Sequence, residues 1–120
     1  MGLTGRPRFT FPKSRRLLKS AEFRQVYDQG FKVACRCFVA FCWKCPEADG
    51  PKMGFTTPRV LGKSTLRNRM KRRLRETIRL RLGQVDAHWR IVWNLRRTSL
   101  TAPLAQLESE VEKVFERCKG

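Results

Sequence analysis

The stretch of this 120-residue chain that says most about its fold is Arg67-Asn68-Arg69-Met70-Lys71-Arg72-Arg73-Leu74-Arg75-Glu76. At 3.6 residues per turn, the apolar residues of this stretch and its surroundings share one stripe of a helix. That stripe consists of Leu66, Met70, Leu74, Thr77 and Ile78. A row of cations spaced four residues apart runs beside this stripe and consists of Arg67, Lys71, Arg75 and Arg79. Asn68 and Arg72 lie further around the helix, away from the stripe. The stretch therefore predicts a helix that buries an apolar side and exposes a broad cationic side.

The charge of the whole chain agrees with this basic helix. Lys and Arg number 27 against 10 Asp and Glu, so the net charge is +17. Like charges repel both at i, i+4 on the helix and across the molecule, and an anionic partner would relieve that repulsion. We therefore expect the basic face to bind nucleic acid, rather than to be merely solvated. An anionic membrane surface fits less well, because the cations are not confined to one amphipathic helix.

Length and composition predict one folded domain over residues 16–120. Hydrophobic residues make up 41% of the chain, enough for a modest core. Residues 1–15 combine Arg6, Arg8 and Arg15 with Pro7 and Pro12, which is typical of a basic, flexible arm. The chain shows no apolar run of membrane-spanning length and no secretory signal pattern, so neither is expected.

Five cysteines without an export signal favour a reduced, cytoplasmic setting. The closely spaced Cys35, Cys37, Cys42 and Cys45 raise the question of a zinc site. In an alternating strand Cys35 and Cys37 would share one side and Cys42 the other, which does not converge on a tetrahedron. We therefore expect buried, unmetallated thiols and no metal site.

The chain reads as a helix, two or three strands, the basic helix, a strand and a final helix. The first helix runs from Ser20, a plausible N-cap, to Gly30, with Phe23, Val26 and Tyr27 on one face. Residues 31–45 alternate, placing Phe31, Val33, Cys35, Cys37, Val39, Phe41 and Trp43 on one side, with a break expected near Cys35–Cys37.

The remaining elements follow from turn residues and periodicity. After a turn at residues 46–51, a strand at 52–57 should pair back as a hairpin. The basic helix should end near Leu82 with Gly83 as its cap. A strand at 88–95 follows, and Pro103 then opens an amphipathic helix with Leu104, Leu107, Val111, Val114 and Phe115 as its stripe.

No catalytic constellation is visible. His88 is the one histidine, the acidic residues are scattered, and no histidine-and-acid pair accompanies Ser64 or Ser99. Gly62-Lys63-Ser64 is not a phosphate-binding loop of the Walker type, because Thr57 stands where that motif needs glycine. We predict no catalytic residues in this chain.

Several motifs together resemble the protein subunit of bacterial ribonuclease P, over about residues 16–117. They are Arg67-Asn68-Arg69-x-x-Arg72-x-x-Arg75-Glu76, Leu18-Lys19-Ser20-x-x-Phe23-x-x-Val26-Tyr27-x-x-Gly30, Phe38-Val39, and Gly54 followed by Gly62. The resemblance implies an α/β fold of the α+β sandwich type, with a four-stranded sheet and the order α-β-β-β-α-β-α.

The resemblance also implies a function. In that family the RNA subunit carries the catalytic magnesium ions and removes the 5′ leader of precursor tRNA, and the protein binds no cofactor of its own. The implied contacts to the catalytic RNA are Arg67, Asn68, Arg69, Lys71, Arg72 and Arg75. The implied leader-binding residues are Phe23, Tyr27, Val39, Phe41 and Asn68. No protein partner and no membrane are expected. For Phe23 and Tyr27 a core stripe is the alternative to the leader cleft, and for Tyr27 the two are about evenly balanced.

The chain departs from the family pattern in three places. Arg59-Val60 stands where the family usually has a lysine pair. Ser64-Thr65 stands where the family usually has a small residue followed by valine, and the cysteine cluster also departs from the usual family pattern. Two alternatives stay open: a structural ribosomal-type RNA-binding protein, and a DNA-binding regulator. Aromatic residues on the sheet argue against the first, and cations nearly encircling the helix argue against the second.

Overall fold

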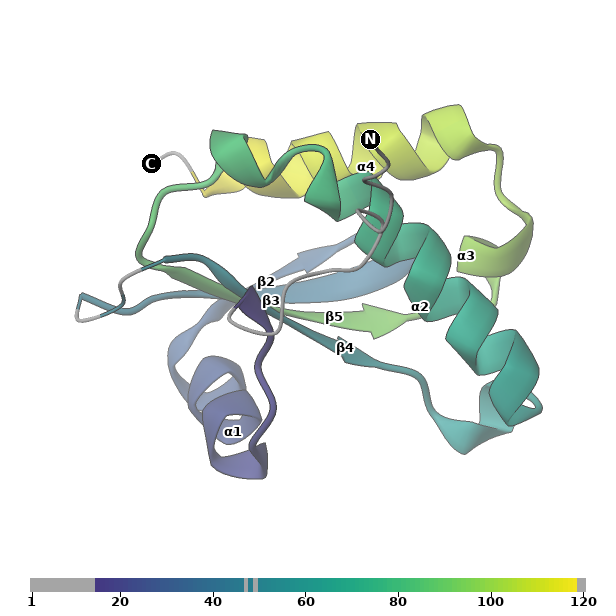
Figure 1. The fold of residues 1–120 in the computed structure, drawn as a ribbon, viewed down its shortest axis with the longest axis horizontal. Helices are drawn as coiled ribbons and strands as arrows, with labels where there is room; N and C mark the ends of the chain where they lie inside the picture. Colours follow the sequence, from purple (N-terminus) through teal and green to yellow (C-terminus); the bar gives the residue numbers. More distant parts are fainter. Residues whose placement is uncertain (1–14, 47, 49, 119–120) are drawn as a thin grey trace, which may run out of the picture.

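In the computed structural model, which describes residues 15–46, 48 and 50–118, a mixed sheet carries helices on both faces (Figure 1). Of the predicted arm, only Arg15 lies within the described residues. The elements are α1 Ser20–Gln29, β2 Phe31–Ala34, β3 Phe38–Lys44, β4 Lys52–Thr56, α2 Ser64–Arg79, β5 Trp89–Leu95, α3 Thr98–Thr101 and α4 Leu104–Arg117. Two 3₁₀ turns are η3 Arg59–Leu61 and η4 Leu82–Gln84. The α+β class is confirmed, and the order differs from the predicted one by the short helix α3.

The sheet has the strand order β2-β3-β5-β4. β2 and β3 form an antiparallel hairpin, and β3 pairs antiparallel with β5. β4 runs parallel to β5, so the predicted hairpin of residues 52–57 with the preceding strand is wrong. The reason lies in β5, whose residues are buried on both faces of the sheet, Val92 on one and Ile91 and Trp93 on the other. A strand buried on both faces belongs at the centre of a sheet, between two neighbours.

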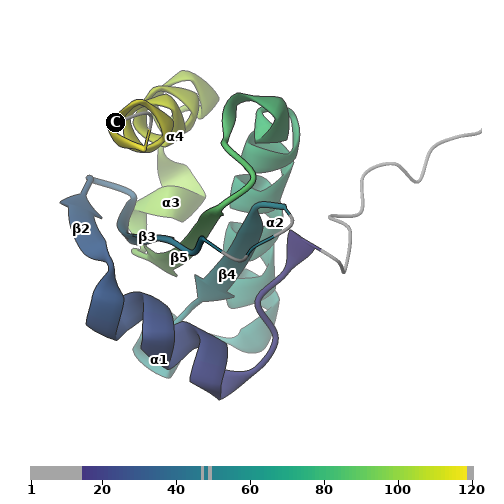
Figure 2. The ribbon, with the colours of Figure 1, turned by 90° about the vertical axis from the view of Figure 1, so that its left-hand side faces the viewer.

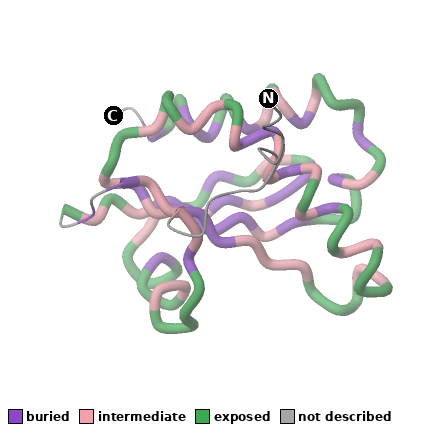
Figure 3. Tube along the Cα trace, in the orientation of Figure 1, coloured by how far each residue is buried: buried purple, intermediate pink, exposed green. Residues whose placement is uncertain are grey.

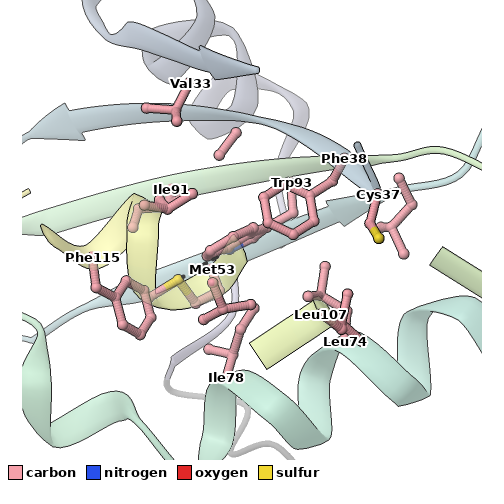
Figure 4. Packing of buried hydrophobic residues seen from close by; sticks show 14 of the residues in the cluster. Val33, Cys37, Phe38, Met53, Leu74, Ile78, Ile91, Trp93, Leu107 and Phe115 are labelled. Carbon is pink, nitrogen blue, oxygen red and sulfur yellow. Dashed lines mark hydrogen bonds between the residues drawn. The ribbon is translucent and has the colours of Figure 1, made fainter. Parts of the chain in front are cut away.

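The helices form two unequal layers. α2 and α4 cover one face of the sheet, and α1 alone covers the other (Figures 1 and 2). The core beneath α2 and α4 is built around Trp93, whose ring lies edge-on to Phe38 at 4.9 Å and to Phe115 at 6.0 Å (Figure 4). Figure 3 shows that buried residues gather along the central strands β3 and β5, whereas the helices carry many exposed residues. No helix in the described part of the chain is long and apolar enough to cross a membrane.

The break predicted near Cys35–Cys37 is confirmed, but it reverses the alternation of side chains. Because Val33 pairs with Ala40, these two residues share the face that packs under α4. Val39, Phe41 and Trp43 therefore face α1, and the prediction that they share a side with Val33 is wrong. The turn offsets the two strands, and strand periodicity is lost across a turn.

The cysteines follow the same offset. Cys37 and Cys42 lie in one apolar cluster, not on opposite sides as predicted. Burial, and then the nearby Glu110 carboxylate, raise the pKa of the Cys37 thiol to about 11. All five thiols are free, and the described residues contain no cluster of three metal-ligating side chains. Cys37 and Cys42 thus pack as small hydrophobic residues.

Two helix ends differ from the predictions. Lys19, not Ser20, is the N-cap of α1, because the Glu22 carboxylate reaches back and accepts from the N–H groups of Leu18 and Lys19, both at 3.1 Å. α2 ends at Arg79, before the predicted Leu82 and Gly83. There Arg81 donates to the Thr77 carbonyl at 3.1 Å, so a side chain replaces the glycine cap.

Candidate nucleic-acid interface

Helix α2 presents its cations as its sequence pattern predicts. Met70, Leu74, Thr77 and Ile78 are buried against the sheet. Asn68, Arg69 and Arg72 are exposed, and the partly exposed cations beside them are Arg67, Lys71 and Arg75. The predicted contacts to RNA therefore all reach solvent. The helix offers an anionic ligand a surface about four turns long.

The electrostatics of this surface favour an anion. The pKa of Lys71 is lowered by burial and then by the neighbouring cations Arg75 and Arg67. The pKa of Arg75 is lowered by burial and then by nearby cations, and its guanidinium carbon lies 6.0 Å from the centroid of the Phe55 ring. Bound phosphate would offset the repulsion among these cations, which after burial is the second cause of both lowered pKa values.

Other arginines of this region serve the fold. Arg73 donates to the Ser99 and Leu100 carbonyls, at 3.0 and 3.2 Å, which ties α2 to α3. Arg79 pairs with Glu76 at 2.7 Å. Arg81 pairs with two carboxylates of α4, those of Glu108 at 3.5 Å and Glu112 at 3.1 Å. Arg73 and Arg81 thus tie α2 and its end to α3 and α4, and leave the outer cations of α2 available to a ligand.

The first turns of α2 frame a polar hollow. It has a volume of about 240 Å³ and is lined by Thr65, Asn68, Arg69 and Arg72. The helix start is fixed by Arg67, whose Nε donates to the Gly62 carbonyl at 3.1 Å. Gly62 has φ of 134°, a conformation that side chains disfavour. The hollow thus combines guanidinium donors with an amide that can donate and accept.

A second polar and aromatic surface lies on the α1 face of the sheet. The Tyr27 hydroxyl donates to Asn94 Oδ1 at 2.9 Å, and the Thr56 hydroxyl donates to the same oxygen at 2.5 Å. The Tyr27 ring stands edge-on to Phe41, with centroids 4.9 Å apart. Tyr27 keeps 38% of its surface exposed, so its ring is held in place yet open to solvent. Val39, half-buried, pairs with Asn94 on the same face.

Phe23 occupies a more enclosed position than Tyr27. It packs against the small cluster of Leu17, Val26 and Val92. A Cβ at Gly54 would lie only 2.7 Å from the Phe23 ring, so that ring rests directly on the backbone of β4. The structure thus brings Tyr27, Phe41 and Val39 to one surface, places Phe23 largely in the packing beneath it, and leaves Asn68 on α2, on the other face of the sheet.

Comparison with known proteins bears on what these surfaces serve. The family model described as Ribonuclease P matches residues 11–119.

The chain belongs to the ribonuclease P protein family.

It is 40% identical over 105 residues to the ribonuclease P protein component of Symbiobacterium thermophilum, covering 88% of this chain and 91% of that one. A solved ribonuclease P protein from Staphylococcus aureus superposes with a TM-score of 0.77 at 28% identity, covering 89% and 97% of the two chains. The Thermotoga maritima structure, at 23% identity and a TM-score of 0.75 over 88% of this chain and 98% of that one, supports the fold. The chain is therefore a bacterial ribonuclease P protein subunit, an RNA-binding component of a tRNA-processing ribonucleoprotein.

Sequence reasoning missed two residues of the ribonuclease P protein's α1 face, Asn94 and Thr56. Both lie in strands, and Asn94 alternates with the apolar side of β5 formed by Ile91, Trp93 and Leu95. A polar residue opposite an apolar strand side is a usable signal. It indicates the face but not the partner, because Tyr27 comes from 67 residues away in the chain.

The departure at Arg59-Val60 also has a structural counterpart. Val60 is 80% exposed and so offers an apolar side chain where the family usually offers a lysine. Arg97 donates to the Val60 carbonyl at 3.1 Å, which brings a guanidinium beside that position. A cation is thus present near Val60, although it comes from the segment after β5.

Proposed function

We propose that this subunit binds the catalytic RNA through the outer cations of α2 and receives the single-stranded 5′ leader of precursor tRNA on the α1 face. The observation that carries the second part is the exposed Tyr27 ring, fixed by Asn94 and Phe41. Stacking on such a ring tolerates any base, as a leader of variable sequence requires. Tyr27, Phe41 and Val39 act as the leader platform, and Phe23 supports it from beneath.

The two contacts divide between the faces of the sheet. The cations that neutralise phosphates of the RNA subunit are Arg67, Arg69, Lys71, Arg72 and Arg75. Asn68, near the start of the same helix, also contacts the RNA subunit. We propose that hydrolysis takes place on the RNA subunit with its magnesium ions. The described residues bring together no carboxylate or histidine cluster that could hold such ions, so no step is assigned to a side chain of this protein.

The alternative of a structural ribosomal-type protein predicts a different use of the α1 face. A protein that clamps duplex RNA relies on cations and shape, and gains little from an open aromatic platform. Membership of the ribonuclease P protein family also favours the leader-binding role. A DNA-binding regulator is disfavoured on the same ground.

The test is reconstitution with the cognate catalytic RNA. We expect the subunit to strengthen binding of precursor tRNA carrying a leader far more than binding of mature tRNA, and Tyr27→Ala to remove most of that difference. The α2 variant Arg72→Ala serves as the matched control, since it should weaken binding of both RNAs. Equal stimulation for precursor and mature tRNA by the parent protein would contradict the proposed leader contact.

A further inference from the structure

Figure 1 shows the end of the sheet where β5 leads into α3. At this end lies a cluster of cations that does not belong to α2. It surrounds a cavity of about 440 Å³ lined by Ala34, Cys35, Arg36, Arg96, Glu110 and Lys113. The cations come from three separate segments: the β2–β3 turn, the residue after β5, and α4. Three chain segments therefore converge to place like charges around one hollow.

These cations have no partner in the part of the chain that the structure describes. The side chains of Arg36, Arg96 and Lys113 form no ion pair or hydrogen bond with another described residue. In this they differ from Arg73 and Arg81, whose charges are used by the fold. Converging cations repel one another, and an anion in the cavity would offset that repulsion.

The one carboxylate of the cavity is already engaged. Glu110 Oε1 accepts from the Cys37 N–H at 2.9 Å, and its Oε2 accepts from Gln106 at 3.0 Å. Both carboxylate oxygens of Glu110 thus accept hydrogen bonds from within the protein, and the three cations remain available to an external ligand. Glu110 still reduces the net charge of the cavity, so the site suits a singly charged phosphodiester better than a dense array of phosphates.

The walls of the cavity are held rigidly. The Arg96 N–H donates to the Cys37 carbonyl at 2.9 Å, and the Thr98 hydroxyl donates to the Arg36 carbonyl at 2.5 Å. The Cys35 N–H closes the turn on the Phe38 carbonyl at 2.8 Å. A ligand would therefore meet a preformed site, with little backbone left to order.

The cavity lies beside the proposed leader platform. Ala34, which lines it, pairs with Val39 of the leader platform. We propose that Arg36, Arg96 and Lys113 form a further binding site for the RNA backbone, which holds a phosphodiester group beside the leader platform. The inference rests on the proposed function only in that the subunit binds RNA.

The first experiment compares two charge-matched triple variants in the reconstituted complex. One carries Arg36→Gln, Arg96→Gln and Lys113→Gln. The control carries Lys19→Gln, Arg24→Gln and Lys44→Gln, at exposed cations of α1, its N-cap included, and of the far end of β3. We expect the first variant to lose about tenfold in RNA affinity and about one unit of the log–log salt slope, and the control to lose much less. Equal losses would overturn the proposal, because net charge alone would explain them.

The RNA used in the assay identifies the source of the phosphate. A loss seen with the catalytic RNA alone assigns the site to the RNA subunit. A loss seen only with precursor tRNA, and growing with leader length, assigns it to the leader. If Tyr27→Ala abolishes leader discrimination while the two triple variants behave alike, the proposed function stands and this inference fails. If the parent protein binds neither RNA, the proposed function itself fails.

The reactivity of the Cys35 thiol gives a local measure of ligand binding that does not depend on the net charge of the protein. Its thiol lines the cavity and is half-buried, whereas Cys45, also half-buried, lies at the other end of β3. Saturating RNA should slow alkylation of Cys35 by iodoacetamide at least about threefold relative to Cys45, as expected for a site covered by a bound strand. Unchanged relative reactivity of Cys35 in the saturated complex would overturn the proposal.

Discussion

Replacing Tyr27 with alanine separates the leader platform from the fold. Tyr27 contributes an edge-on contact to Phe41 and one hydrogen bond to Asn94. The contact is worth about 0.5–1.5 kcal/mol and the hydrogen bond a similar amount, so Tyr27→Ala should lower the free energy of unfolding by roughly 1–3 kcal/mol. Asn94 keeps its hydrogen bond from Thr56 and is not left without a donor. The variant should therefore fold, although with a lower melting temperature.

The effect on substrate binding should be selective. Loss of one stacking surface costs about 1–3 kcal/mol per base, which corresponds to about a 5- to 150-fold weaker binding of precursor tRNA. Binding of mature tRNA should barely change, because it has no leader, and affinity for the catalytic RNA should hold. The assay is equilibrium binding of both tRNAs to the reconstituted complex, below the melting temperature of the variant.

Tyr27→Phe is the matched control for this measurement. It keeps the ring and its contact with Phe41 but removes the hydroxyl that donates to Asn94. It should lose some stability and retain most of the preference for precursor tRNA. If folded Tyr27→Ala keeps the parent ratio of precursor to mature tRNA binding, the ring is not a leader contact and the assignment of the α1 face is wrong.

Further predictions concern the basic helix, catalysis and packing. Arg72→Ala should reduce the salt slope of RNA binding by about one unit, measured between about 50 and 200 mM salt, and an unchanged slope would remove Arg72 from the phosphate contacts. Purified protein without RNA should not cleave precursor tRNA in magnesium; cleavage abolished by a point mutation in this chain would refute the RNA-based mechanism. Gly54→Ala should lower stability by about 1–3 kcal/mol in thermal unfolding, because its Cβ would lie 2.7 Å from the Phe23 ring; wild-type melting would show that the ring can shift freely.

The basic helix shows what local sequence determines. The spacing of Met70, Leu74 and Ile78 predicts both the helix and its buried side, and the structure confirms both. The same holds for β5 and for α4, whose Leu107, Val111, Val114 and Phe115 are buried, although Leu104 at the helix start is exposed. Periodicity reports the type of an element and its apolar side because both depend on neighbours within about two turns or a few strand residues.

The partners of each element were decided only by the tertiary structure. Nothing local to residues 52–57 distinguishes an antiparallel partner in β3 from a parallel partner in β5, and competition for the buried centre of the sheet settles the matter. The same limit explains the reversed face of Val39 and Phe41, because a turn of a few residues changes the phase of the alternation. The Tyr27–Asn94 pair and the convergence of Arg36, Arg96 and Lys113 join segments far apart in the chain. The local sequence determined the long helices, the strands and the charge of this protein, but not the short helix α3. Long-range packing decided which side chains meet, because contacts across the sheet leave no periodic trace in the sequence.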